Sequence, residues 1–169
     1  MLTYHPAFDI YHCAFRILLL ADKMPMQVIE VDRMRIWDFY FVFPNQLKNV
    51  SFPRDLWSLK SGIKNEENPY EDLRNSEIMF ERMKPFQLSA LKYLAGYGFI
   101  DSEALSNNNI KRTTKKIPKK LSSKMVELDS QQEYLIKLLS SPFNELPLYG
   151  DKGLKARTKL IDFKYDAAA

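Results

Sequence analysis

Four residues near the N-terminus are of types that bind metals or carry out acid–base and nucleophilic chemistry. His5 and His12 are the only histidines, Asp9 lies between them, and Cys13 follows directly. A helix would bring the two histidines to one face after about two turns. Asp9 converges on them only partly, however, and no second cluster completes a coordination shell. We therefore expect His5 to cap a helix, His12 to lie at an interface, and Cys13 to be a buried structural cysteine.

The rest of the chain carries none of the motifs that mark common enzyme classes. Its five glycines are scattered, and none precedes a Lys-Ser or Lys-Thr pair as in a phosphate-binding loop. The paired carboxylates Glu66-Glu67 and Glu71-Asp72 lie in a charged tip, where they favour solubility. We predict that the protein is not an enzyme and uses no cofactor or metal, with an unrecognised enzyme as the third hypothesis.

A lysine-rich segment between residues 111 and 124 is a candidate for nucleic-acid contact. It holds seven basic residues and no acidic one. Such a segment suits the phosphate backbone of double-stranded DNA, although a charge run is as often only a solvated loop. One arginine is weak support for reading base edges. The candidates for DNA contact are Lys111, Arg112, Lys115, Lys116, Lys119, Lys120 and Lys124.

Two aromatic segments in the N-terminal part are candidates for docking a partner protein. The stretch Ile36–Phe43 carries aromatic residues around the whole predicted helix, which exceeds what one face of a small protein needs. Charges set among aromatics suit specific docking, whereas the opposing interpretation assigns all these aromatics to the core. The candidate interface residues are Phe8, Tyr11, His12, Phe15, Arg33, Arg35, Trp37, Phe39, Tyr40 and Phe41.

Apolar residues spaced by three and four predict the helices that must position these candidates. The five predicted helices span residues 6–23, 28–43, 70–83, 86–97 and 123–140. For residues 36–43 a strand is the rival interpretation. Pro85 is expected to break the chain between the third and fourth helices, because proline disrupts a helix interior. Residues 45–70 are predicted to be a loop with an exposed tip, and Phe99–Asp101 a short extended piece.

Two helices around Pro85, a short extended piece and a basic excursion follow in the order of a winged helix. We predict a mainly α fold with a small β wing, in which a winged-helix-like domain is preceded by an N-terminal helical pair. The predicted parts are an N-terminal helical region (1–84), a winged-helix-like core with its basic wing (85–125), and a C-terminal helix and tail (126–166). Together they form one compact unit.

Composition agrees with a soluble globular protein of 169 residues, 46% hydrophobic and 27% charged. The formal net charge of +4 permits contact with nucleic acid without demanding it. One cysteine allows no intrachain disulfide and favours a reducing compartment. The longest apolar run, Ile17–Ala21, is too short for a bilayer, and the N-terminus lacks the basic region of a signal peptide. We expect a cytoplasmic protein without membrane contact.

Three long stretches, Tyr4–Ile17, Glu30–Pro44 and Phe80–Leu94, carry a resemblance to a known family. Together they resemble the middle component of bacterial ABC-three component systems. These systems are related to Lamassu-type anti-phage defence systems, in which an LmuC-like subunit has a similar role. The resemblance covers about residues 4 to 105 and brings no catalytic residue with it.

The resemblance implies a three-part system directed against phages or plasmids. An SMC- or Rad50-like ATPase senses DNA, an effector subunit, often a nuclease, does the damage, and the middle component joins them by docking on the ATPase heads. Double-stranded DNA would then be contacted through the complex. The alternative is a standalone winged-helix DNA-binding regulator. Such regulators usually dimerise, and this chain has no heptad pattern for a dimerisation helix.

Overall fold

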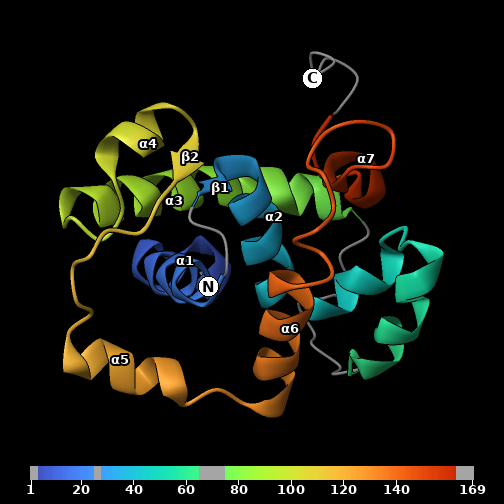
Figure 1. Cartoon of the computed structure of the whole chain (residues 1–169), viewed down its shortest axis with the longest axis horizontal. Helices are drawn as coiled ribbons and strands as arrows, with labels where there is room; N and C mark the ends of the chain where they lie inside the picture. The colour runs from blue at the N-terminus through green and yellow to red at the C-terminus, as the bar shows by residue number, and fades with distance from the viewer. Residues whose placement is uncertain (1–3, 25–27, 65–74, 163–169) are drawn as a thin grey trace.

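A computed structural model of the chain describes residues 4–24, 28–64 and 75–162, and within them most of the structure is helical (Figure 1). The elements in chain order are the 3-10 helix η1 (Pro6–Phe8), α1 (Ile10–Lys23), β1 (Ile29–Glu30), α2 (Val31–Val42), the 3-10 helices η2 (Pro44–Asn49) and η3 (Arg54–Gly62), α3 (Ser76–Gly96), α4 (Ser102–Ser106), β2 (Asn109–Ile110), α5 (Lys119–Val126), α6 (Ser130–Ser140) and α7 (Leu154–Thr158). The predicted fold class, mainly α with a small β part, is confirmed.

Helices α1, α2 and α3 form the centre of the molecule, and the most extensive packing is between α1 and α3. Helix α1 begins where the Asp9 carboxylate accepts a hydrogen bond from the His12 N–H at 2.8 Å. This bond satisfies one of the free N–H groups of the first turn. Ile17, Leu20 and neighbouring residues of α1 are buried against the other two helices. The predicted helix over residues 6–23 is confirmed apart from its first turn, which is η1.

A buried polar cluster ties these three helices together. The Asp38 carboxylate on α2 is fully buried and accepts hydrogen bonds from Arg16 Nε at 2.6 Å and from Gln87 Nε2 at 2.9 Å. Gln87 Oε1 in turn accepts from Arg35 Nε at 3.1 Å. Each central helix therefore contributes at least one member, and a change in how the helices pack would leave a buried charge without its partner.

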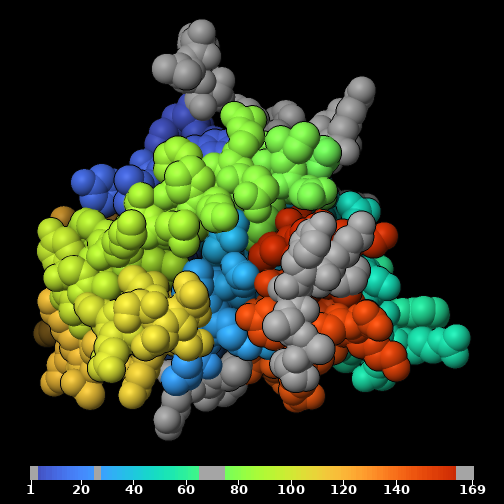
Figure 2. Space-filling model, turned by 90° about the horizontal axis from the view of Figure 1, so that it is seen from above, coloured from blue at the N-terminus to red at the C-terminus, as the bar shows by residue number. Residues whose placement is uncertain are grey.

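Helix α3 runs unbroken from residue 76 to residue 96, so the predicted break at Pro85 is wrong. Seen from above, α3 crosses one face of the molecule (Figure 2). Phe80 and Met83 before the proline and Gln87 after it are all buried on the same side of the helix. Packing of both halves against one core overrides the local cost of the proline. The predicted boundary between residues 84 and 85 thus falls inside a helix, and residues 70–74 lie outside the described part.

A small sheet closes one end of this helical centre. β1 pairs antiparallel with β2, with Ile29 opposite Ile110 and Glu30 opposite Asn109. Next to this pair, Ile100 forms an isolated bridge with Arg112. The extended piece predicted at Phe99–Asp101 is therefore bridged to the residues that follow β2, whereas β1 was not predicted. Asn108 turns the chain into β2 with a φ of 57°, a conformation that asparagine tolerates better than most residues.

The C-terminal part departs from the prediction, because residues 123–140 are not a single helix, α5 begins at Lys119 inside the predicted wing, and α7 was not predicted. Helix α5 ends at Val126, and α6 begins at Ser130 after an intervening turn. Asp129 and Gln132 form a capping box at the start of α6, in which each side chain accepts a hydrogen bond from the other's backbone N–H. Residues 45–62, predicted as a loop, contain η2 and η3. None of the described helices has the length and apolar character needed to cross a bilayer.

Candidate docking groove

The docking residues predicted on α2 belong to the core, and this half of the predicted interface is wrong. Trp37 and Phe39 are fully buried, and the most exposed aromatic among them, Phe41, is only 9% exposed. An apolar pattern around a whole helix also describes a helix enclosed by its own fold, and that is the arrangement here. The six residues concerned are Arg33, Arg35, Trp37, Phe39, Tyr40 and Phe41.

The two arginines of this set are held inside the molecule by partners both near and distant in sequence. Arg33 pairs with Glu30 at 2.7 Å and donates from Nη1 to the Leu146 carbonyl oxygen at 2.8 Å. Burial raises the pKa of Glu30, but the hydrogen bond from Arg33, a backbone hydrogen bond and the charge of Arg33 together lower the pKa overall. Arg35 lies with its guanidinium carbon 4.5 Å from the centre of the Phe80 ring. These charges therefore stabilise the fold and are not presented to a partner.

The four residues considered for metal or nucleophilic chemistry do not converge. Cys13 is fully buried next to Asp38, and burial raises the pKa of its thiol, which disfavours the nucleophilic thiolate. Asp9 caps α1, and His5 Nδ1 accepts a hydrogen bond from the Ala7 N–H at 3.1 Å. His12 is exposed. Within the described residues, no group of three His, Cys, Asp or Glu side chains could hold a metal ion.

The seven basic candidates divide into two groups. Arg112 and Lys115 have structural partners: Arg112 donates to the Phe99 carbonyl oxygen and pairs with Asp22 at 3.6 Å, while Lys115 Nζ donates to the Tyr97 carbonyl oxygen. The other five are exposed, and their side chains make no hydrogen bond or ion pair with any described residue. These five are Lys111, Lys116, Lys119, Lys120 and Lys124.

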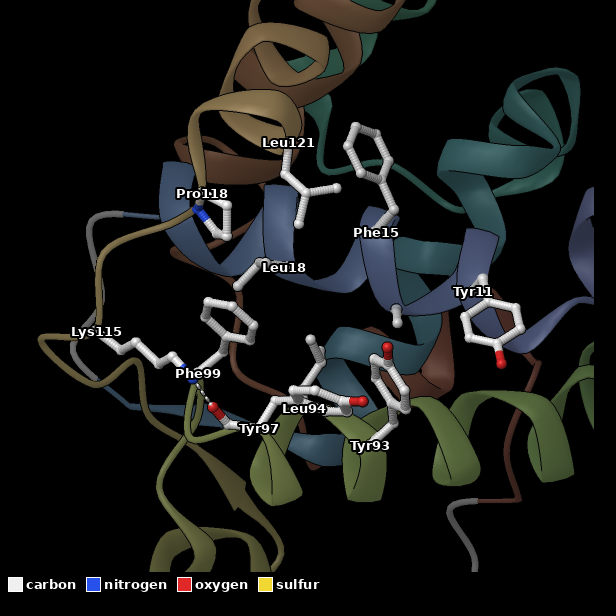
Figure 3. Close-up of a pocket in the computed structure, with 11 residues that line it drawn as sticks. Tyr11, Phe15, Leu18, Tyr93, Leu94, Tyr97, Phe99, Lys115, Pro118 and Leu121 are labelled. Atoms are coloured by element: carbon white, nitrogen blue, oxygen red, sulfur yellow. Dashed lines mark hydrogen bonds between the residues drawn. The ribbon is translucent and has the colours of Figure 1, made fainter.

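An apolar hollow of about 380 Å³ lies between α1, the second half of α3 and the start of α5 (Figure 3). We call it the α1–α3–α5 groove. Its floor is aliphatic and aromatic, and Lys115 and Pro118 stand at the edge where the chain enters α5. The lining residues are Tyr11, Ala14, Phe15, Leu18, Tyr93, Leu94, Tyr97, Phe99, Lys115, Pro118 and Leu121.

Three tyrosines with large exposed surfaces border this groove. Tyr11 is 70% exposed, Tyr97 55% and Tyr93 37%. The ring centres of Tyr93 and Tyr97 are 4.6 Å apart, and Tyr11 meets Tyr93 edge-on at 5.8 Å. The hydrogen bond with Tyr97 and desolvation raise the pKa of Tyr93. Tyr93 and Tyr97 were not among the predicted site residues, although their spacing of four on a predicted helix places them side by side.

The groove brings together residues that were predicted to belong to two separate surfaces. Tyr11 and Phe15 come from the predicted docking set, and Lys115 comes from the predicted DNA-contact set. A second hollow of about 460 Å³ adjoins it at Phe15 and includes His12. The remaining member of the docking set on this side, Phe8, is half-buried. The exposed faces of α1 and of the lysine-rich segment thus form one continuous candidate site.

Comparison with known proteins places the chain in a family. The family model described as ABC-three component (ABC-3C) system Middle Component 5 matches residues 2–166. This match extends beyond the part that carries the resemblance in sequence and includes α5 and the lysine-rich segment. No curated protein and no solved structure matches the chain.

Proposed function

Because this chain belongs to the Middle Component 5 family of ABC-three component systems, we propose that it is a non-enzymatic adaptor subunit of a defence complex. In this proposal it links an SMC- or Rad50-like ATPase, at the ATPase heads, to an effector subunit such as a nuclease. The finer likeness to Lamassu-type systems belongs to the same proposal. A small protein with an apolar docking surface bordered by a charged segment suits the task of holding two larger components together.

The observation that carries the proposal is the α1–α3–α5 groove with its exposed tyrosines. Contiguous apolar surface that stays exposed on a small soluble protein is a usual mark of an interaction site. Tyrosine is enriched at the energetic centres of protein interfaces, because it combines a large apolar ring with a hydroxyl that can hydrogen-bond. The groove offers three such rings above an apolar floor.

Contact with double-stranded DNA is a second element of the proposal, and the five exposed lysines between residues 111 and 124 support it. Lysines without internal partners are available to phosphates, whereas Arg112, held by Phe99 and Asp22, is not available for reading bases. The expected binding is therefore independent of sequence and sensitive to salt. Because the lysines border the groove, DNA and a partner protein would approach the same side.

We also propose a revised location for the winged-helix-like unit. The order α1, β1, α2, α3, Phe99–Asp101 and β2, with residue 112 bridged to residue 100 and β1 paired to β2, is the winged-helix order with an insertion between α2 and α3. The wing would then be the turn that contains α4. The lysine-rich segment would follow the last strand. The observation in support is the two-stranded sheet, with the Ile100–Arg112 bridge beside it, next to three central helices.

A co-purification experiment distinguishes the adaptor function from the alternative, a DNA-binding regulator. The full chain is mixed with the ATPase component of the same system and passed over a size-exclusion column in high salt. The adaptor proposal expects the two proteins to elute together, because an apolar interface resists salt. A defined footprint of the isolated chain on DNA, without association with the ATPase or the effector, would favour the regulator instead.

A further inference from the structure

Exposed lysines stand next in the chain to residues that line the α1–α3–α5 groove on the α3 and α5 sides. They are Lys92 on α3, Lys116 before α5, and Lys119 and Lys120 in the first turn of α5. No acidic residue occurs between Arg82 and Gly96 or between Ala104 and Val126. Asp22, at the end of α1, is already paired with Arg112. An occupant of the groove would therefore meet a field that favours negative charge.

The floor of the groove selects for apolar side chains. Leu18, Leu94 and Leu121 face the hollow from three different helices (Figure 3). A volume of about 380 Å³ is within the range of pockets that bury small ligands, and it accommodates a few large side chains. A groove between helices with this chemistry is the usual seat of an amphipathic helix, which buries residues at spacings of three and four.

The arrangement of the tyrosine rings argues against a nucleic-acid strand in the groove. Base stacking requires a free ring face. Tyr93 and Tyr97 lean on each other with an interplanar angle of 40°, and Tyr11 stands edge-on to Tyr93 at 89°. Tyr93 and Tyr97 therefore cover part of each other's faces, and the three rings do not form a row of parallel faces. Such a surface fits apolar and hydrogen-bonding side chains better than a row of bases.

We propose that the α1–α3–α5 groove binds an amphipathic helical segment of a partner protein, with apolar anchor residues on one face and Asp or Glu residues beside them. This inference rests on the adaptor role proposed above, and it specifies the chemistry of the segment through which the adaptor holds its ATPase or its effector. Tyr93 and Tyr97 are the central contacts, and Lys119 and Lys120 attract the acidic flank.

The test uses overlapping peptides that cover the ATPase and effector components of the same system. The full chain is titrated against each fluorescent peptide, and anisotropy reports the Kd. We expect the binding peptides to carry apolar residues at helical spacing with acidic flanks. Tyr93→Ala together with Tyr97→Ala should weaken them about tenfold or more. Binding only to basic or uniformly polar peptides would overturn the proposal.

Matched controls separate loss of the groove from loss of the fold. Tyr149→Ala and Trp57→Ala remove exposed aromatics outside the groove and should leave the Kd unchanged, and circular dichroism verifies that every variant is folded. Tyr11→Glu, at a site 70% exposed, provides a second groove variant, which should repel an acidic segment. Lys119→Glu with Lys120→Glu should weaken binding and reduce its salt dependence. Equal affinity of the folded groove variants and the unchanged chain would overturn the proposal.

The adaptor role is tested separately, by measuring whether the unchanged chain and the groove variants assemble with the ATPase or the effector. If the unchanged chain assembles with the ATPase or the effector and the groove variants assemble equally well, the groove inference fails and the adaptor role stands. If the unchanged chain assembles with neither, both fail. If the tyrosine variants lose affinity for DNA while they keep the peptides, or lose a dimer of the chain itself, the groove has a different occupant and the inference is overturned.

Discussion

Asp38 is a carboxylate without exposed surface, and its partners come from the two helices that pack beside α2. Arg16 approaches it at 2.6 Å and Gln87 at 2.9 Å. A buried ion pair adds little net stability over an apolar pair of the same shape, but breaking it is costly because the other charge stays buried. The cluster therefore acts chiefly to make one arrangement of the three helices preferable to others.

Replacement of Asp38 by alanine should lower the free energy of unfolding by about 3–5 kcal/mol, because Arg16 would keep its charge in the core without a carboxylate to balance it. Urea unfolding followed by circular dichroism measures the change. Glu81→Ala is the control, since Glu81 is half exposed and 3.7 Å from Arg35, and such a pair contributes about 1 kcal/mol or less. A loss for Asp38→Ala as small as that of the control would show that the cluster does not hold the helices together.

His5 makes stability depend on pH. Burial, and then the charge of Arg16, lower its pKa below the ordinary value of 6.5. The unfolded chain therefore takes up a proton at higher pH than the folded chain, so the stability contribution is complete above 6.5 and is lost as pH falls through the folded pKa. We expect the free energy of unfolding to decrease between about pH 7 and pH 5. In His5→Asn, which keeps a cap for the Ala7 N–H, the decrease should be smaller; an identical pH profile would contradict this role.

Prediction from sequence at this scale succeeded where a residue's partners are local. His5 caps the turn that follows it, and Cys13 is buried, both as expected. Arg33 and Arg35 were assigned to an interface because a charge among aromatics resembles a docking surface. Besides ion pairs with Glu30 and Asp32 three residues away, they bond to Leu146 and Gln87, which lie 113 and 52 residues away, and no local spacing reveals those two contacts.

Helix α3 contains an exposed proline that the fold tolerates at a cost. Pro85→Ala should restore a backbone hydrogen bond and relieve the contact of the ring with the preceding turn, which raises the free energy of unfolding by about 1–3 kcal/mol. Part of the gain is offset because alanine is more flexible in the unfolded chain. Thermal and urea unfolding measure the net change in the free energy of unfolding. A decrease in stability would mean that the proline fits a kink on which the packing of α3 depends.

The lysine-rich segment, which runs up to α5 and through most of that helix, is the part of the chain through which DNA contact would occur. Charge reversal of Lys116, Lys119, Lys120 and Lys124 should weaken binding of the assembled complex to double-stranded DNA. The slope of log K against log salt should fall by up to about 0.9 for each phosphate that is no longer neutralised. Fluorescence anisotropy at several salt concentrations measures both quantities.

Reversal at four exposed lysines elsewhere (Lys23, Lys84, Lys137 and Lys152) is the matched control and should have the smaller effect. Equal DNA affinity for the first variant and the unchanged complex would show that the lysine-rich segment does not contact DNA. The test leaves out Lys115, because its bond to the Tyr97 carbonyl gives it a structural role.

Elements were predictable where a long amphipathic pattern exists. Helices α1 and α2 follow from their spacing, and the helical interpretation of residues 36–43 was correct. β1 and β2 have two residues each, too few for any alternation to show. The division between α5 and α6 was missed although Asp129 and Gln132 have the spacing of a capping box, because apolar residues at helical spacing occur on both sides of it.

At the scale of the whole molecule, the two surfaces predicted from sequence turn out to be neighbours. Helix α1, the second half of α3 and the entry into α5 are far apart in the chain, and packing brings their exposed faces around one groove. Sequence patterns identify apolar and charged faces, but they do not say which faces meet. The sequence alone therefore did not distinguish the predicted docking residues on α2, which lie in the core, from those on α1, which line the groove.

The adaptor role requires that the ATPase and the effector associate only when this chain is present. Mass photometry of the three purified components tests this requirement most directly. The ATPase and the effector are mixed with and without this chain, at a concentration where each alone is monodisperse. We expect a species containing both only when the chain is present, and a reduced amount of it with Tyr93→Ala and Tyr97→Ala. An ATPase–effector complex that forms equally well without the chain would contradict the adaptor role.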